Sequence, residues 1–155
     1  MRRIRNGNLR SRYFGICYQK ASKITKAKLF VCDVNNGLDM FNDDFFDLVV
    51  MFDVIEHLKS PFNVLKHVYR ISKPEGKLII TTPNLNALDR FIKKLIGKEY
   101  EWYGFYDKTH LYLFTSPSLK FLVERARFKI VKLETPFHPL PKFLQIVANK
   151  TESGG

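Results

Sequence analysis

Three side chains that can exchange protons or bind metal ions follow one apolar run. In the stretch DLVVMFDVIEHLKSP, residues 47–61, the run ends at Asp53, and Glu56 and His57 come shortly after it. On a helical turn these positions are i, i+3 and i+4, so the three side chains project from one face. A second imidazole, His110, occurs later in DKTHLYLF. The set could hold a divalent metal, or His57 could act as a neutral general base without one. Glu56 and His57 could also only hydrogen-bond the turn, with His110 packed against aromatic rings.

Apolar runs and amphipathic stretches alternate along the chain and predict the elements that position these side chains. The expected strands are residues 13–18, 29–34, 45–53, 77–82, 128–134 and 142–150. The expected helices are residues 19–28, a helix that begins at Ser60-Pro61, residues 85–96, and a helix from Ser116-Pro117 to about Arg125. In the helix after Pro61, apolar residues lie on one face: Phe62, Leu65, Val68 and Tyr69. The run 45–53 is apolar on both faces, which is typical of a central parallel strand.

This alternation predicts an α/β fold, with a mostly parallel sheet covered by helices on both faces. The last two strands are joined by a short loop that only an antiparallel pair can use. Ligands of such sheets bind beyond the carboxyl ends of the strands. Asp33, Asp53 and Thr82 all come at those ends. We therefore expect the acidic side chains after LVVMF to point into the ligand crevice.

The net charge of +11 is concentrated at the start of the chain. Nine of the 26 Lys and Arg residues lie in residues 1–32, which contain no acid. We interpret residues 1–12 as a basic leader, either an arm for a polyanion or a solvated segment, residues 13–150 as one domain, and residues 151–155 as a disordered tail. No apolar run reaches 18 residues, so no membrane span is expected. Cys17 and Cys32 lack C-x-x-C spacing, which favours a reduced, cytoplasmic protein.

Three stretches of the chain resemble the class I S-adenosylmethionine-dependent methyltransferases, in particular the branch with D-V-I-E-H-L after the fourth strand. They are FDLVVMFDVIEHL, VLKHVYRISKPEGKLIITTPN and THLYLFTSPSLKFLVERARFKIV. The resemblance implies a Rossmann-like fold and transfer of a methyl group from S-adenosylmethionine to a small-molecule acceptor, at oxygen more than at nitrogen. Nucleic acid is not the expected partner, because outside residues 1–32 the 17 basic residues are nearly balanced by 15 acidic ones.

The family begins with a strand and a glycine-rich turn that wraps the cofactor, and nothing similar precedes Tyr13. The resemblance therefore implies that residue 13 begins the second strand and that the first strand is missing. The acid that the family has at the end of that second strand is replaced by Cys17 or Tyr18. We expect weak cofactor binding and impaired activity. The alternative is a non-catalytic binding or scaffold module, which would self-associate or bind a partner at an open sheet edge.

The resemblance also assigns roles to single residues. Asp33 and the neighbouring backbone of Val34 correspond to the adenine contact. Phe52 and Asp53 correspond to the lining of the methionine end.

Some O-methyltransferases of this superfamily, in the ubiquinone pathway and in small-RNA 2′-O-methylation, hold a divalent metal with two carboxylates and two imidazoles. The matching positions here are Asp53, Glu56, His57 and His110, although the small-RNA group has Glu where this chain has Asp53. Such an ion would lower the pKa of the acceptor hydroxyl. The aromatic-rich segment 97–114 would form a wall of the acceptor pocket or a cover for the helices below it.

Overall fold

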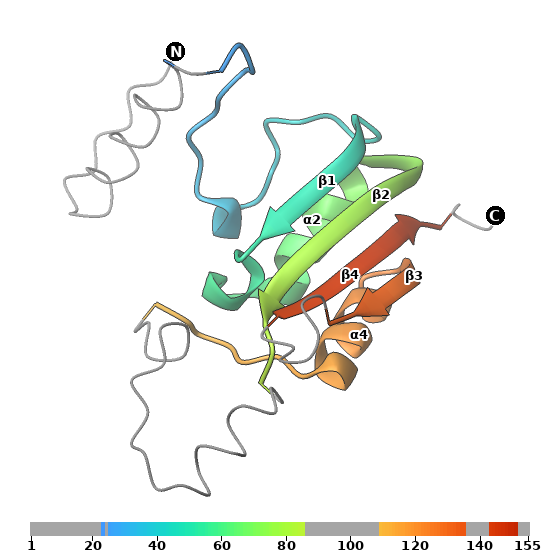
Figure 1. Ribbon diagram of the computed structural model, residues 1–155. Helices are drawn as coiled ribbons and strands as arrows, with labels where there is room; N and C mark the ends of the chain where they lie inside the picture. Colours follow the sequence, from blue (N-terminus) through green and yellow to red (C-terminus); the bar gives the residue numbers. More distant parts are fainter. Residues whose placement is uncertain (1–22, 24, 86–108, 136–142, 152–155) are drawn as a thin grey trace, which may run out of the picture. The chain divides into compact units, whose positions relative to one another are not determined.

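The computed structural model describes residue 23 and residues 25–85, 109–135 and 143–151 (Figure 1). The chain divides into two units, Met1–Asp33 and Val34–Gly155. In the first unit, residues 25–33 form neither helix nor strand. The expected leader 1–12, strand 13–18, helix 85–96 and tail lie almost entirely outside the described residues.

The second unit contains a four-stranded sheet in the order β1-β2-β4-β3. Its strands are β1 (Phe46–Phe52), β2 (Ser72–Pro83), β3 (Phe128–Glu134) and β4 (Phe143–Lys150). β1 and β2 are parallel, whereas β4 is antiparallel to both β2 and β3. In Figure 1 the two α-helices, α2 (Pro61–Ile71) and α4 (Ser116–Arg125), lie together behind the sheet. The described part of the unit also contains two short 3-10 helices, η1 (Val34–Asn36) and η2 (Ile55–His57).

The core lies between the sheet and the two helices. Leu78 and Ile80 alternate with half-buried residues along β2, as the two-residue period of a strand requires. Ile146 of β4 is paired with Ile80, so both side chains point to the helix-covered face. From α2, Leu65 and Val68 are fully or nearly fully buried against this layer. The predicted apolar face of α2 is thereby confirmed, with Phe62 and Tyr69 half-buried at its margin.

Helix α4 begins with a reciprocal capping box. Thr115 Oγ1 accepts a hydrogen bond from the Ser118 amide, and Ser118 Oγ accepts one from the Thr115 amide, at 3.3 and 2.9 Å. Thr115 is therefore the N-cap, one residue before the predicted Ser116, and Pro117 lies in the first turn. Such caps satisfy amides that have no partner within the helix.

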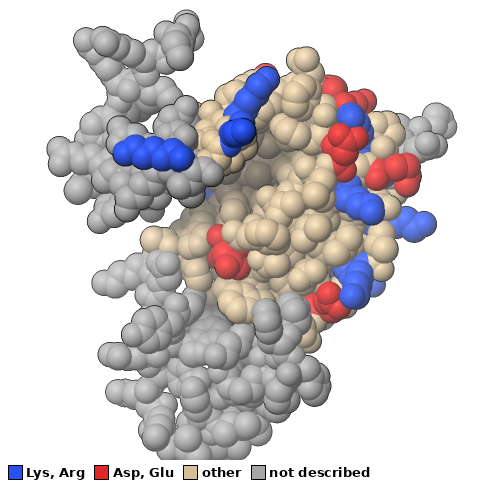
Figure 2. All heavy atoms as spheres, turned by 45° about the horizontal axis from the view of Figure 1, so that its top comes forward, with Lys and Arg blue, Asp and Glu red and all other residues tan. Residues whose placement is uncertain are grey.

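The opposite face of the sheet carries exposed apolar side chains. On β1, Leu48, Val50 and Phe52 point to this face and are 48, 41 and 63% exposed. Much of the face visible in Figure 2 lacks Lys, Arg, Asp and Glu, and a strip of alternating acidic and basic side chains runs along one side of it. The prediction that β1 is buried on both faces is therefore wrong for the described residues, among which β1 is an edge strand with a single neighbour.

Further comparisons test the predicted elements. The α/β class and the antiparallel last strand are confirmed. The strand expected at 29–34 is wrong, because residues 29–33 are irregular and Val34 begins η1. A strand needs a neighbouring strand, and the described residues of the first unit include no strand. Residues 25–28, expected in a helix, are also irregular. No described helix combines the length and the hydropathy that crossing a bilayer demands.

Candidate active site

The site begins where β1 ends in a tight turn. Asp53 has φ of 50°, in the left-handed region that Asp tolerates better than most residues. Its amide donates to the Thr81 carbonyl at 3.1 Å, and its Oδ1 accepts a hydrogen bond from Thr81 Oγ1 at 3.3 Å. These contacts to β2 hold the turn, and η2 then starts at Ile55. The strand thus delivers Glu56 and His57 at its carboxyl end.

Glu56 is the most unusual of these side chains because it is almost entirely buried, at 1% exposure. Its Oε2 accepts a hydrogen bond from Thr82 Oγ1 at 3.0 Å, while Oε1 has no hydrogen-bond partner among the described residues. Burial raises the pKa of the Glu56 carboxyl above its ordinary value, and the hydrogen bonds that it accepts only partly oppose this effect. A buried carboxyl with one oxygen unsatisfied is expensive for stability and typical of functional sites.

The backbone of the segment after Thr109 docks on this same turn. The Glu56 carbonyl accepts hydrogen bonds from the amides of Leu111 and Tyr112, at 2.8 and 3.1 Å. Further along, Phe114 forms a parallel bridge with Asn84, just beyond β2. These backbone contacts carry His110 to the carboxyl end of the sheet, as the sequence predicted.

The two imidazoles meet there. The rings of His57 and His110 lie 4.6 Å apart between centroids, edge to face at 61°. His57 Nδ1 is 3.1 Å from the Thr109 carbonyl oxygen and 3.0 Å from Thr109 Oγ1. His110 Nδ1 is buried and has no hydrogen-bond partner among the described residues. One donor atom each of Glu56, His57 and His110 lies within 4.8 Å of the other two. We call these three residues the Glu-His-His cluster.

A family profile described as a methyltransferase domain matches residues 11–133, which is most of the chain and includes the whole Glu-His-His cluster. The chain belongs to this methyltransferase domain family. The predicted membership of the class I S-adenosylmethionine-dependent methyltransferases is thereby confirmed.

Similar proteins agree with the assignment. The ubiquinone biosynthesis O-methyltransferase of Burkholderia thailandensis is 32% identical over 100 residues, which are 63% of this chain and 43% of that protein. The curated relatives named ubiquinone biosynthesis O-methyltransferase are matched over only 21 to 43% of their own lengths. A S-adenosylmethionine-dependent methyltransferase structure from Aquifex aeolicus superposes with a TM-score of 0.64 at 14% identity, covering 88% of this chain and 63% of that one. The 1,6-didemethyltoxoflavin-N1-methyltransferase of B. thailandensis, solved with S-adenosylhomocysteine, gives 0.60 at 19% identity over 90 and 56% of the two chains.

The methyltransferase domain places the four residues predicted to bind cofactor in different surroundings. Phe52 and Asp53 lie together at the carboxyl end of β1, and both are exposed. Val34 in η1 packs against the core, and Asn35 Oδ1 beside it accepts a hydrogen bond from the Lys59 amide at 2.8 Å, so η1 lies next to the segment after η2. Asp33 ends the first unit and is exposed. Their cofactor contacts remain predictions.

The structure brings together three of the four predicted metal ligands. Asp53 is not in the Glu-His-His cluster, and its carboxylate faces Thr81. Two threonines beside the cluster had no predicted role in orienting it. The sequence pattern identifies Thr82 only as the end of a strand, and it assigns no role to Thr109. Thr109 precedes His110 directly, and this adjacency was the only signal that could have found it.

Proposed function

We propose that this domain transfers a methyl group from S-adenosylmethionine to a hydroxyl oxygen of a small-molecule acceptor, at the carboxyl end of β1. The observation that carries the proposal is the Glu-His-His cluster, which sits where α/β sheets bind their ligands. Family membership supports the reaction class. The relatives named ubiquinone biosynthesis O-methyltransferases support oxygen as the acceptor atom.

The cofactor would lie across the end of β1 and η1. In this proposal Phe52 and Asp53 line its methionine end, while Asp33 and the Val34 backbone contact adenine. Exposure of Phe52 and Asp53 leaves both side chains accessible to a ligand.

His57 is the proposed general base. Nδ1–H can donate to the Thr109 carbonyl, which leaves the lone pair on Nε2 available to the acceptor. The acceptor hydroxyl then loses its proton to Nε2 while its oxygen attacks the methyl carbon. The new O–C bond forms as the S–C bond breaks, and S-adenosylhomocysteine leaves with the bonding electron pair on sulfur.

As an alternative to the His57 base, the cluster could hold a divalent metal ion, and His57 would then be a ligand. Glu56 Oε1 and His110 Nδ1 are buried atoms without a hydrogen-bond partner among the described residues, and a metal ion would satisfy a buried carboxylate or imidazole of this kind. One possible ligand atom from each of the three residues lies within 4.8 Å of the other two, and side-chain rotations would have to bring these atoms closer together to hold one ion. Mixed oxygen and nitrogen ligands suit Mg²⁺, Mn²⁺ or Zn²⁺. Bound there, the ion would lower the pKa of the acceptor hydroxyl.

The reaction is tested with labelled S-adenosylmethionine and a panel of phenols and catechols, with and without Mn²⁺. We expect methyl transfer that falls at least 100-fold in His57→Gln and stays unchanged in the control His67→Gln, because His67 lies on α2 beside Asp39. The impairment expected from the sequence would appear as a low rate of the unmodified chain. Transfer that is equal in His57→Gln and the unmodified chain would exclude the proposed base.

A second candidate function is a binding module, and the exposed apolar residues of β1 favour it. β1 is an edge of the described sheet, so its free backbone groups and its apolar face are available to a second copy or another protein. Light scattering of Val50→Lys beside the unmodified chain tests this candidate. A monomer in both proteins, with measurable methyl transfer, would leave the enzyme as the better proposal.

A further inference from the structure

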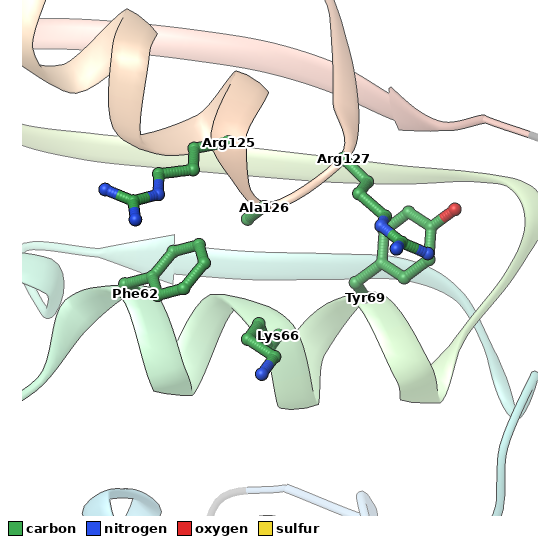
Figure 3. A pocket seen from close by; sticks show the side chains of 6 residues that line it. All are labelled: Phe62, Lys66, Tyr69, Arg125, Ala126 and Arg127. Carbon is green, nitrogen blue, oxygen red and sulfur yellow. The ribbon is translucent and has the colours of Figure 1, made fainter.

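A second concave site lies on the helix side of the sheet. It is a groove of about 480 Å³ between α2 and the junction of α4 with β3. Figure 3 shows its two walls: Phe62 and Tyr69 rise from α2 toward the end of α4, whereas the Lys66 side chain runs along α2 with its amine on the side away from the arginines. The lining residues are Phe62, Lys66 and Tyr69 on α2, and Arg125, Ala126 and Arg127 opposite them. The groove shares no residue with the Glu-His-His cluster.

Every ionisable side chain that lines the groove, apart from the Tyr69 phenol, is a cation. Lys66, Arg125 and Arg127 form no ion pair with a carboxylate in the described part of the chain. Other cations of the same unit do form such pairs: Arg70, Lys73, Lys120, Lys132 and Lys150. Glu124, the acid next to Arg125 in sequence, pairs with Lys120. Three cations that line one concavity repel each other and together attract an anion.

Arg127 occupies a position that normally favours glycine. α4 ends at Arg125 with Ala126 as its C-cap, so Arg127 is the next residue, and its φ is +71°. Helices commonly end with a glycine in this left-handed conformation, because a Cβ is disfavoured there. Arg125 alone could be explained by attraction to the negative end of the helix. A strained arginine at a glycine position, lining a groove with two other cations, indicates a role for its side chain.

Two aromatic side chains, Phe62 and Tyr69, give the groove an apolar surface beside its cations. Arg125 Cζ and Lys66 Nζ lie 5.0 and 5.8 Å from the centre of the Phe62 ring, so the ring makes cation–π contacts with both side chains. Tyr69 is held in place, since its hydroxyl donates to the Thr151 carbonyl at 2.9 Å and its ring meets Phe128 edge to face at 5.3 Å. A rigid aromatic wall suits a flat ring on the ligand.

We propose that this groove binds a small-molecule phosphate monoester with a flat organic ring. A phosphate monoester carries close to two negative charges at neutral pH, which matches three cations better than one carboxylate does. The volume of the groove is in the range of small-ligand sites. The phosphate would contact the arginines and Lys66, and the ring would lie against Phe62 and Tyr69.

The test uses the full chain, labelled with ¹⁵N, and three probes. Phenyl phosphate is expected to shift the amide signals of residues 62–69 and 125–127 saturably, and more weakly at higher salt. Inorganic phosphate should shift the same signals at higher concentration, and phenol should not. A phenol response equal to that of phenyl phosphate would overturn the proposal, as would no response to phenyl phosphate. A phosphotyrosine peptide that binds more than tenfold tighter than phenyl phosphate would overturn the small-molecule assignment in favour of a phosphopeptide.

Variants separate binding from folding. Arg127→Gly should raise the melting temperature, because glycine removes the backbone strain, and should weaken phenyl phosphate binding about tenfold. Arg125→Gln should weaken binding similarly, while Lys120→Gln, which removes a paired cation from the same helix, should not. Unchanged affinity in Arg127→Gly would overturn the role of this side chain, whichever way the melting temperature moves.

Discussion

Thr82 donates a 3.0 Å hydrogen bond to Glu56 and so links the end of β2 to the turn that follows β1. Only one carboxylate oxygen is satisfied in this way, since Oε1 has no partner among the described residues. Thr82 therefore fixes the position of the buried Glu56 carboxyl in the proposed site, but it provides a hydrogen bond to only one of the two carboxyl oxygens.

The pH dependence of stability should report this buried acid. Burial raises the folded pKa of Glu56 above its ordinary value of 4.5, so the folded state holds the proton more tightly than the unfolded state. Its contribution to the free energy of unfolding is fully present below about pH 4.5 and is lost as pH rises through the folded pKa. In Glu56→Gln this loss should be absent.

Urea denaturation from pH 4 to 8, with a chelator present, measures the difference between the two proteins. Glu124→Gln, which removes an exposed acid of α4, is the control and should follow the unmodified profile. Parallel profiles for Glu56→Gln and the unmodified protein would show that Glu56 does not titrate in this way.

Metal binding should depend on both histidines of the cluster. His57→Ala and His110→Ala are each expected to weaken Mn²⁺ or Zn²⁺ binding at least tenfold, because each removes one ligand. Isothermal titration of chelator-treated protein checks this, with His67→Ala as the control. Retention of metal affinity in either cluster variant would remove that histidine from the ligand set.

Cofactor binding should distinguish the two aspartates of β1 and its turn. Asp53→Asn should weaken S-adenosylmethionine binding several-fold, whereas Asp47→Asn, near the opposite end of the strand, should have no effect. Asn is the right replacement because it tolerates the left-handed backbone at position 53 as well as Asp does. Calorimetric titration of both variants is the measurement, and equal effects would place Asp53 outside the cofactor site.

The sequence predicted those parts of the fold that depend on local patterns. The run FKIVKLE is confirmed as a strand, although a register shift between Ile130 and Lys132 interrupts its alternation, and the apolar face of the helix after Pro61 is confirmed as its buried side. The convergence of His57 and His110, which are 53 positions apart in sequence, was expected from the strand end that carries His57 and from the family resemblance. What could not be predicted depends on neighbours distant in sequence. LFVCDV has a strand-like composition but no described partner strand, and the half-satisfied state of Glu56 depends on a threonine 26 residues away.

Two leucines on the paired strands β1 and β2 test which face of the sheet carries the core. Leu78→Ala should lower the free energy of unfolding by about 2–5 kcal/mol, because the side chain is fully buried. Leu48→Ala should cost below about 1 kcal/mol, since Leu48 is 48% exposed. Chemical denaturation measures both. A large loss at Leu48 would mean that this face is covered in solution.

The position of β4 constrains how the sheet can form during synthesis. This strand, Phe143–Lys150, comes after the other described strands in sequence but lies between β2 and β3 in the sheet. While the ribosome has yet to release residues 143–150, β2 has no partner on that side, and β3 has no described neighbour at all. Until β4 is made, the backbone groups of β2 and β3 that pair with it have no partner in the described sheet, which makes this interval the one in which a chaperone would have most to protect.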